Sequence, residues 1–138
     1  MARELDAEAL RLLATFESVT GVEAIDCVVD DARDRVAFVV PAGDIAAAIG
    51  PDGRTVEALE GRLGRDVHLV ELAERAEDFV ANCLRPAAVY GVTIEDGRAI
   101  VEVADADRGT AIGAGGGRIE LARTLAARHF DLETVELA

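Results

Sequence analysis

One fourteen-residue pattern occurs twice in this chain of 138 residues, and the repeat limits the folds that the chain can adopt. The segment AAIGPDGRTVEALE aligns without gaps on TAIGAGGGRIELAR, which lies 63 residues later. The alignment pairs Gly50 with Gly113 and Gly53 with Gly116, and the upstream segment RVAFVVP aligns on RAIVEVA at the same offset. A strand, a Gly-x-x-Gly turn and a helix that recur in the same order predict two copies of one folding unit.

The first copy is predicted to contain three helices and three strands. Apolar residues from Leu5 to Phe16 at helical spacing predict a first helix, which ends at Gly21. Two β-branched runs joined by the segment DARD predict a hairpin, and Asp44 can cap a short helix before the turn. The next helix is expected to end at Gly64. The predicted ranges are helices 4–21, 44–49 and 54–63, and strands 21–30, 35–42 and 66–72.

The second copy repeats this order of elements. Its first helix is expected to end at Arg85-Pro86, since proline disfavours a helical conformation in the residue before it. Asp96-Gly97 is a favoured two-residue hairpin turn, and Asp105 or Asp107 is expected to cap the short helix before the second turn. The predicted ranges are helices 73–84 and 118–128, and strands 88–95, 98–104 and 130–137.

The charge of the chain is unusual, because its net value is −13 and all 14 basic residues are arginine. Such a composition is typical of proteins from a high-salt archaeal cytoplasm, where screening makes an acidic surface tolerable. An acidic mesophilic protein from a GC-rich genome is the alternative. No apolar run approaches the ~18 residues of a membrane span, and the first residues lack a signal-peptide layout. We therefore expect a soluble cytoplasmic protein.

The remaining polar and sulfur side chains form no set that predicts catalysis. Cys27 and Cys83 lie far apart in apolar contexts without metal-type spacing, so buried free thiols are expected. His68 and His129 have no partnered nucleophile and are expected to be structural. The glycine-rich segment differs from a GxGxxG nucleotide loop, since Arg118 occupies the position of the last glycine, and it lacks the Lys-Ser/Thr ending of a P-loop. We therefore expect no enzyme activity, no metal and no cofactor.

The two Ile-Gly-x-x-Gly turns, each between two helices and flanked by strands, resemble the turn of the K-homology (KH) RNA-binding domain. The extra helix and strand before this core resemble the type II form, and the tandem resembles the short archaeal relatives of the transcription factor NusA. The resemblance implies an α+β fold with type II KH domains over 1–72 and 73–138. Each domain would have the order α-β-β-α-α-β, with a three-stranded mixed sheet and helices on one face.

The same resemblance implies a function in transcription elongation, termination or antitermination. Single-stranded RNA would be the ligand, RNA polymerase or its elongation complex would be a partner, and no membrane would be involved. In KH domains the Gly-x-x-Gly turn holds about four nucleotides by their backbone. The implied RNA-binding residues are Ile49, Gly50, Pro51, Asp52, Gly53, Arg54, Arg108, Ile112, Gly113, Ala114, Gly115, Gly116, Gly117 and Arg118.

Elementary electrostatics supports a backbone contact at these turns. A turn without side chains lets phosphate and sugar approach the main chain, and the N–H groups at the start of the next helix attract an anion. We therefore expect that aspartate in place of both Gly113 and Gly116 abolishes RNA binding and leaves the fold intact.

The first turn departs from the family pattern, in which a basic residue usually lies in or beside the turn. Asp52 carries a negative charge there, and Pro51 has no N–H group. The alternative function is therefore a degenerate KH pair that acts as a scaffold for protein interactions. Arg54 and Arg118 could contact phosphate or pair with local acids. Four apolar residues could line a groove for bases or belong to the core: Ile49, Val56, Ile112 and Ile119.

Overall fold

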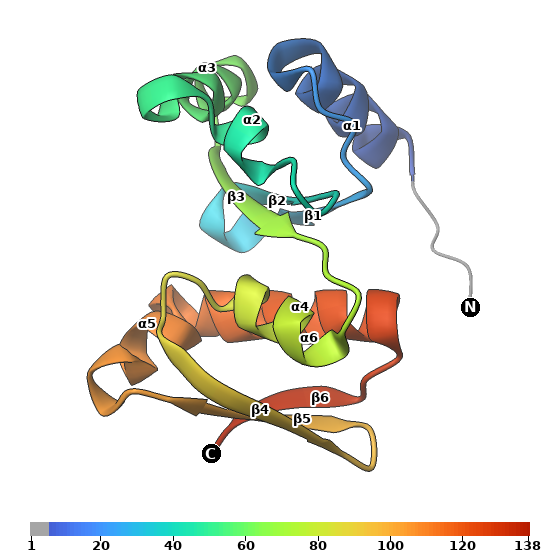
Figure 1. Cartoon of the computed structure of the whole chain (residues 1–138). Helices are drawn as coiled ribbons and strands as arrows, with labels where there is room; N and C mark the ends of the chain where they lie inside the picture. The colour runs from blue at the N-terminus through green and yellow to red at the C-terminus, as the bar shows by residue number, and fades with distance from the viewer. Residues whose placement is uncertain (1–5) are drawn as a thin grey trace. The chain divides into compact units, whose positions relative to one another are not determined.

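The computed structural model describes residues 6–138, and contacts between Cα atoms divide the chain into two compact units (Figure 1). The first unit is Met1–Leu72 and the second is Ala73–Ala138. Residues 4 and 5, predicted to begin the first helix, lie outside the described residues. Within residues 6–138, no helix is both long enough and apolar enough to cross a membrane.

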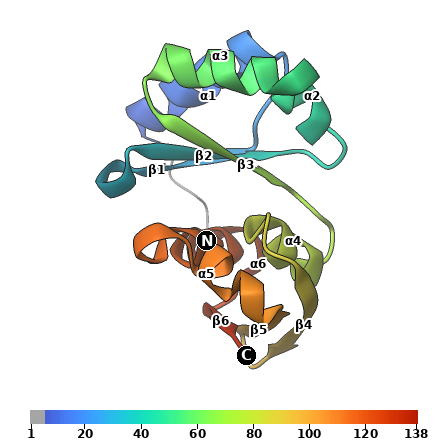
Figure 2. The same cartoon turned by 90° about the vertical axis from the view of Figure 1, so that its left-hand side faces the viewer.

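The first unit has its helices on one face of a three-stranded sheet (Figure 2). Its elements are α1 (Ala7–Thr20), β1 (Asp26–Asp30), β2 (Arg35–Val40), α2 (Ile45–Ile49), α3 (Arg54–Leu63) and β3 (Asp66–Glu71). The strand order is β1-β2-β3, with β1 antiparallel and β3 parallel to β2. The sheet is therefore mixed, as predicted.

Local sequence determines where α1 begins and ends. The side chain of Asp6 accepts a hydrogen bond from the Ala9 amide at 2.8 Å, and Gly21 ends the helix with a left-handed φ of 73°. Phe16 on α1 is fully buried, and its ring centroid lies 4.4 Å from that of Phe38 on β2. The other buried members of this core are Val22, Cys27, Val36, Val40, Ala48 and Leu59.

The second unit repeats this arrangement, with α4 and α6 over one face of its sheet (Figure 1). Its elements are α4 (Ala76–Cys83), β4 (Val89–Glu95), β5 (Arg98–Val103), α5 (Arg108–Ile112), α6 (Gly117–Phe130) and β6 (Thr134–Leu137). The strand order is β4-β5-β6, with β4 antiparallel and β6 parallel to β5. Phe79 of α4 is fully buried, and the ring of Phe130 lies 5.3 Å away.

The order of elements confirms the predicted α+β fold with two mixed sheets. The predicted hairpin turn has φ values of 51° at Asp96 and 76° at Gly97, as a type I′ turn requires. The final strand is shorter than predicted, because α6 continues to Phe130 and Asp131 ends it with a φ of 55°. The strand β6 therefore begins only at Thr134.

The two predicted side-chain caps of the short helices are wrong. Asp44 and Asp107 occupy the N-cap positions of α2 and α5, but neither side chain makes the capping hydrogen bond. The carboxylate of Asp107 instead accepts a hydrogen bond from the Ala88 amide at 3.0 Å, and Asp105 belongs to a preceding 3₁₀ turn. Each short helix has 5 residues and therefore depends on packing for its stability.

Both cysteines are free and buried, as predicted. The thiol of Cys27 donates a hydrogen bond to the Ala9 carbonyl at 3.7 Å. Burial raises the pKa of the Cys83 thiol, which disfavours the reactive thiolate. His129 also has a structural environment, because its ring packs edge-on against Phe79 at 5.6 Å.

Candidate nucleic-acid interface

The two Gly-x-x-Gly turns have the same backbone conformation. Gly50 has φ 77° and ψ 174°, and Gly113 has φ 79° and ψ 169°. The last glycines, Gly53 and Gly116, have φ values of 72° and 80°, and both have a ψ of 12°. The repeat in the sequence is therefore also a repeat in backbone geometry.

The third residue of each turn adopts the left-handed conformation. Asp52 has φ 54° and ψ 28°, and Gly115 at the equivalent position has φ 60° and ψ 23°. Aspartate tolerates this region better than most residues do. The difference between the two turns at this position is therefore the carboxylate and not the backbone.

The first glycine of each turn is required by packing within its own unit. Its φ and ψ lie in a region that is essentially restricted to glycine. A Cβ on Gly50 would lie 2.0 Å from the Oγ1 of Thr55, and a Cβ on Gly113 would lie 2.7 Å from the backbone nitrogen of Arg118. The expectation that aspartate at Gly113 leaves the fold intact is therefore wrong.

The last glycine of each turn, in contrast, faces open space. A Cβ built on Gly53 or Gly116 would have no heavy atom within 4 Å outside the adjacent residues. The middle residues of the turns are exposed: Pro51, Asp52, Ala114 and Gly115. Both turns are thus accessible to a ligand that approaches the main chain.

Each turn leads directly into the N terminus of a longer helix. Helix α3 has 10 residues and α6 has 14, and the glycines at their N-cap positions provide no side-chain cap. The N–H groups in the first turn of a helix have no partner within the helix, and the helix dipole places partial positive charge there. The Arg54 and Gly117 amides, which begin these helices, donate to the Pro51 and Ala114 carbonyls, so it is the partial positive charge of the dipole that suits an anion.

The three predicted arginines have different surroundings. Arg54 is exposed and forms no ion pair with the described residues. Arg108 is also exposed, and its Nη1 donates a hydrogen bond to the Ala138 carbonyl at 2.8 Å. Arg118 is half-buried, and its Nη1 donates to the Thr110 carbonyl. Arg108 and Arg118 thus both bond within the second unit, but Arg54 and Arg108 are exposed to a phosphate, whereas Arg118 is half-buried.

The apolar residues near the turns differ in their exposure to solvent. Ile49 and Ile112, each immediately before a turn, are 37% and 41% exposed. Ile119 is buried in the core, and Val56 is half-buried. Gly117 is buried as the first residue of α6, so it does not share the exposed surface of the turn.

Thr55 is absent from the residues predicted for the site, although it lies against the first turn. The offset of the repeat pairs Thr55 with Arg118, and both residues lie beside the first glycine of their turn. The repeat alone could have identified this equivalence. The close approach itself depends on the backbone of the turn, which sequence spacing does not give.

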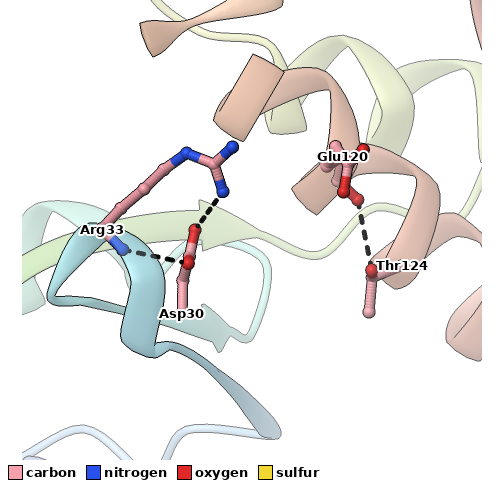
Figure 3. A network of polar contacts seen from close by, with 4 residues as sticks. All are labelled: Asp30, Arg33, Glu120 and Thr124. Atoms are coloured by element: carbon pink, nitrogen blue, oxygen red, sulfur yellow. Dashed lines mark hydrogen bonds and ion pairs between the residues drawn. The ribbon is translucent and has the colours of Figure 1, made fainter. Parts of the chain in front are cut away.

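Other polar contacts in the two units are local. In the first unit, the Asp30 carboxylate accepts hydrogen bonds from Arg33 Nη1 at 2.9 Å and from the Arg33 amide at 3.2 Å (Figure 3). The side-chain hydrogen bond from Arg33 holds the pKa of Asp30 below its usual value. In the second unit, Thr124 Oγ1 donates to the Glu120 carbonyl at 3.2 Å.

Among residues 6–138, no group of three histidine, cysteine or acidic residues could hold a metal.

Two α+β units, each with an exposed Gly-x-x-Gly turn between two helices, define a tandem KH-domain protein. Residues 13–74 match the model of the KH domain, and residues 76–138 match that of the NusA-like second KH domain. The crystal structure of the protein APE1850 has the same fold, with a TM-score of 0.80 and 32% identity. That match covers 96% of this chain and 99% of the other.

Sequence relatives identify the particular family. A protein of Halobacterium salinarum named probable transcription termination protein NusA is 53% identical over 140 residues, which covers 99% of both chains. A protein of the same name from Halococcus morrhuae is 53% identical over 137 residues, which covers 97% of both chains. The chain belongs to the NusA family of KH-domain proteins, whose members are transcription factors and not enzymes.

Proposed function

We propose that the chain binds single-stranded RNA through its Gly-x-x-Gly turns and thereby acts in transcription termination or antitermination. The observation that carries this proposal is the pair of exposed turns with one backbone conformation, each followed by a helix N terminus. Membership of the NusA family supports the role in transcription. RNA polymerase or its elongation complex is the proposed partner, and the cytoplasm is the proposed location.

The proposed contact depends more on the main chain than on side chains. Gly53 and Gly116 leave space for the sugar-phosphate backbone, and the partial positive charge at the N termini of α3 and α6 attracts the phosphate. Arg54 and Arg108 add positive charge, and the exposed isoleucine before each turn adds an apolar surface for a ribose or base. Each turn would hold about four nucleotides.

The net charge of −13 requires that binding depend on short-range contacts. The halobacterial relatives support a high-salt environment for this chain. At multimolar salt the screening length falls to about 3 Å or less, so the acidic surface repels RNA only at contact distance. Counterion release contributes little under these conditions. Hydrogen bonds from the turns and apolar contacts then provide the affinity.

The proposal is tested with the double variant Gly115→Asp and Gly116→Asp, which fills the exposed surface of the second turn. Both positions have a left-handed backbone, a conformation that Asp52 and Asp131 adopt in this chain, so the fold should persist. In about 3 M KCl, the affinity for an unstructured RNA of about eight nucleotides should fall about tenfold or more. Fluorescence anisotropy with labelled RNA measures this change.

Gly64→Asp is the matched control for this variant. Gly64 ends α3 with a φ of 68°, and a Cβ there meets no heavy atom within 4 Å. The control adds the same carboxylate on the same kind of backbone outside the turns, so RNA affinity should not change. Equal affinity of the wild type and the double variant would contradict the proposal. Polymerase association without any RNA affinity would instead support the protein-interaction scaffold.

Asp52→Asn should increase the affinity for RNA at low salt. The substitution removes an exposed charge and keeps a residue that tolerates the left-handed conformation. Two charges about 4 Å apart in water interact by about 1 kcal/mol, so the gain should be about fivefold. The measurement uses the lowest KCl concentration at which circular dichroism shows folded protein. The gain should shrink as KCl rises, whereas Glu17→Gln on the exposed side of α1 should give no gain.

A further inference from the structure

We propose that Arg118 is a positioning residue that holds the second turn in its RNA-binding conformation, an inference that rests on the function proposed above. Its Nη1 donates a hydrogen bond to the Thr110 carbonyl, and its Nε is buried. Its backbone nitrogen also occupies the space beside Gly113 that a side chain would need. One residue of α6 therefore contacts both α5 and the first glycine of the turn.

Helix α5 is short and has no side-chain cap, so a contact from α6 stabilises it. Its 5 residues end where the turn begins, and helices of this length are unstable alone. Backbone hydrogen bonds at the turn join the Gly113 amide to the Gly109 carbonyl at 2.9 Å, the Gly116 amide to the Gly113 carbonyl at 3.0 Å, and the Gly117 amide to the Ala114 carbonyl. None of these three bonds joins α6 to α5. The bond from Arg118 crosses from α6 back to α5 and so fixes the two helices relative to each other.

The first turn lacks this cross-link. Thr55 occupies the equivalent position in the repeat, and its side chain forms no hydrogen bond with the described part of the chain. A turn that is already ordered loses less conformational freedom when it binds a ligand. The second turn should therefore contribute more of the RNA affinity than the first.

Positioning and direct phosphate contact give different dependences on salt. Removing an arginine that neutralises one phosphate reduces the slope of log affinity against log salt concentration by about 0.7 for single-stranded nucleic acid. The exposed Arg108 is placed to neutralise a phosphate, whereas the guanidinium of Arg118 is directed into its own unit. Arg118→Gln should therefore weaken RNA binding with an unchanged slope, and Arg108→Gln should reduce the slope.

The experiment compares Arg118→Gln with the matched variant Arg123→Gln. Arg123 also lies on α6, and its Nε donates to the Val135 carbonyl at 3.0 Å, away from the turn. Both variants remove an arginine–carbonyl bond, but only Arg118→Gln should lower RNA affinity, by about fivefold, because such bonds contribute roughly 1 kcal/mol. Amide hydrogen exchange at Gly113 and Gly116 should accelerate in Arg118→Gln and not in Arg123→Gln.

RNA affinity equal to that of the wild type in Arg118→Gln would overturn the inference. A salt dependence whose slope falls as in Arg108→Gln, with unchanged amide hydrogen exchange at the turn, would also overturn it. Arg118→Lys provides a second test if the glutamine variant unfolds, because it keeps the charge without the planar guanidinium. Weaker binding by this variant supports positioning, and full retention of affinity overturns it. Absence of RNA binding by the wild type would overturn the proposed function itself, a result distinct from failure of this inference.

Discussion

Replacing Gly113 by alanine should lower the free energy of unfolding of the second unit by about 3 kcal/mol or more. The native φ of 79° and ψ of 169° lie where residues other than glycine are rarely found. The new Cβ would also lie 2.7 Å from the backbone nitrogen of Arg118 and 2.9 Å from its Cβ. Relief of this close approach requires α6 to move. Urea unfolding at high KCl, followed by circular dichroism, measures the loss.

Gly116→Ala is the control, because it makes the same chemical change three residues away. The φ of Gly116 is 80°, but its Cβ would meet no heavy atom within 4 Å. The left-handed conformation alone should cost about 1–2 kcal/mol for alanine. An equal decrease in the free energy of unfolding in the two variants would show that the close approach to α6 is not the reason why position 113 requires glycine.

Phe16→Ala should destabilise the first unit by about 3–5 kcal/mol, the range for loss of a buried aromatic ring. The side chain of Phe16 is fully buried, and its ring packs on that of Phe38 at 4.4 Å. The cavity would lie between α1 and β2, within the core of the first unit. Thermal unfolding, monitored by circular dichroism at constant KCl, gives the change in stability.

Leu10→Ala on the same helix separates burial from helix propensity. Leu10 is 55% exposed, so its truncation should change the free energy of unfolding by about 0.5 kcal/mol or less. A loss of less than about 1 kcal/mol in Phe16→Ala would contradict the assignment of that ring to the core.

The sequence predicts most element boundaries because these depend on nearby residues. Gly21 and Gly64 end their helices with a left-handed φ, and Asp96-Gly97 forms the expected hairpin turn. The cap at Asp107 is predicted wrongly because its carboxylate bonds an amide 19 residues away. A pattern of neighbouring residues in the sequence does not reveal a contact between residues that are so far apart in the chain.

The position of the candidate site is predictable from the repeat, but the reason for its glycines is not. The sequence pattern suggests that every glycine of the two turns serves a ligand. The structure shows two kinds of glycine, since Gly50 and Gly113 are required by packing, whereas Gly53 and Gly116 face open space. The inward bond of Arg118 is likewise not visible in the pattern, because spacing does not tell which way a side chain points.

We claim that RNA contacts the main chain of the turns, and amide NMR can observe this contact residue by residue. Nitrogen-15-labelled protein is titrated with single-stranded RNA in about 3 M KCl, where long-range repulsion is screened. We expect the largest chemical-shift changes at residues 113–118 and smaller changes at 50–55. Shifts confined to the sheets, or no shifts at saturating RNA, would contradict the claim.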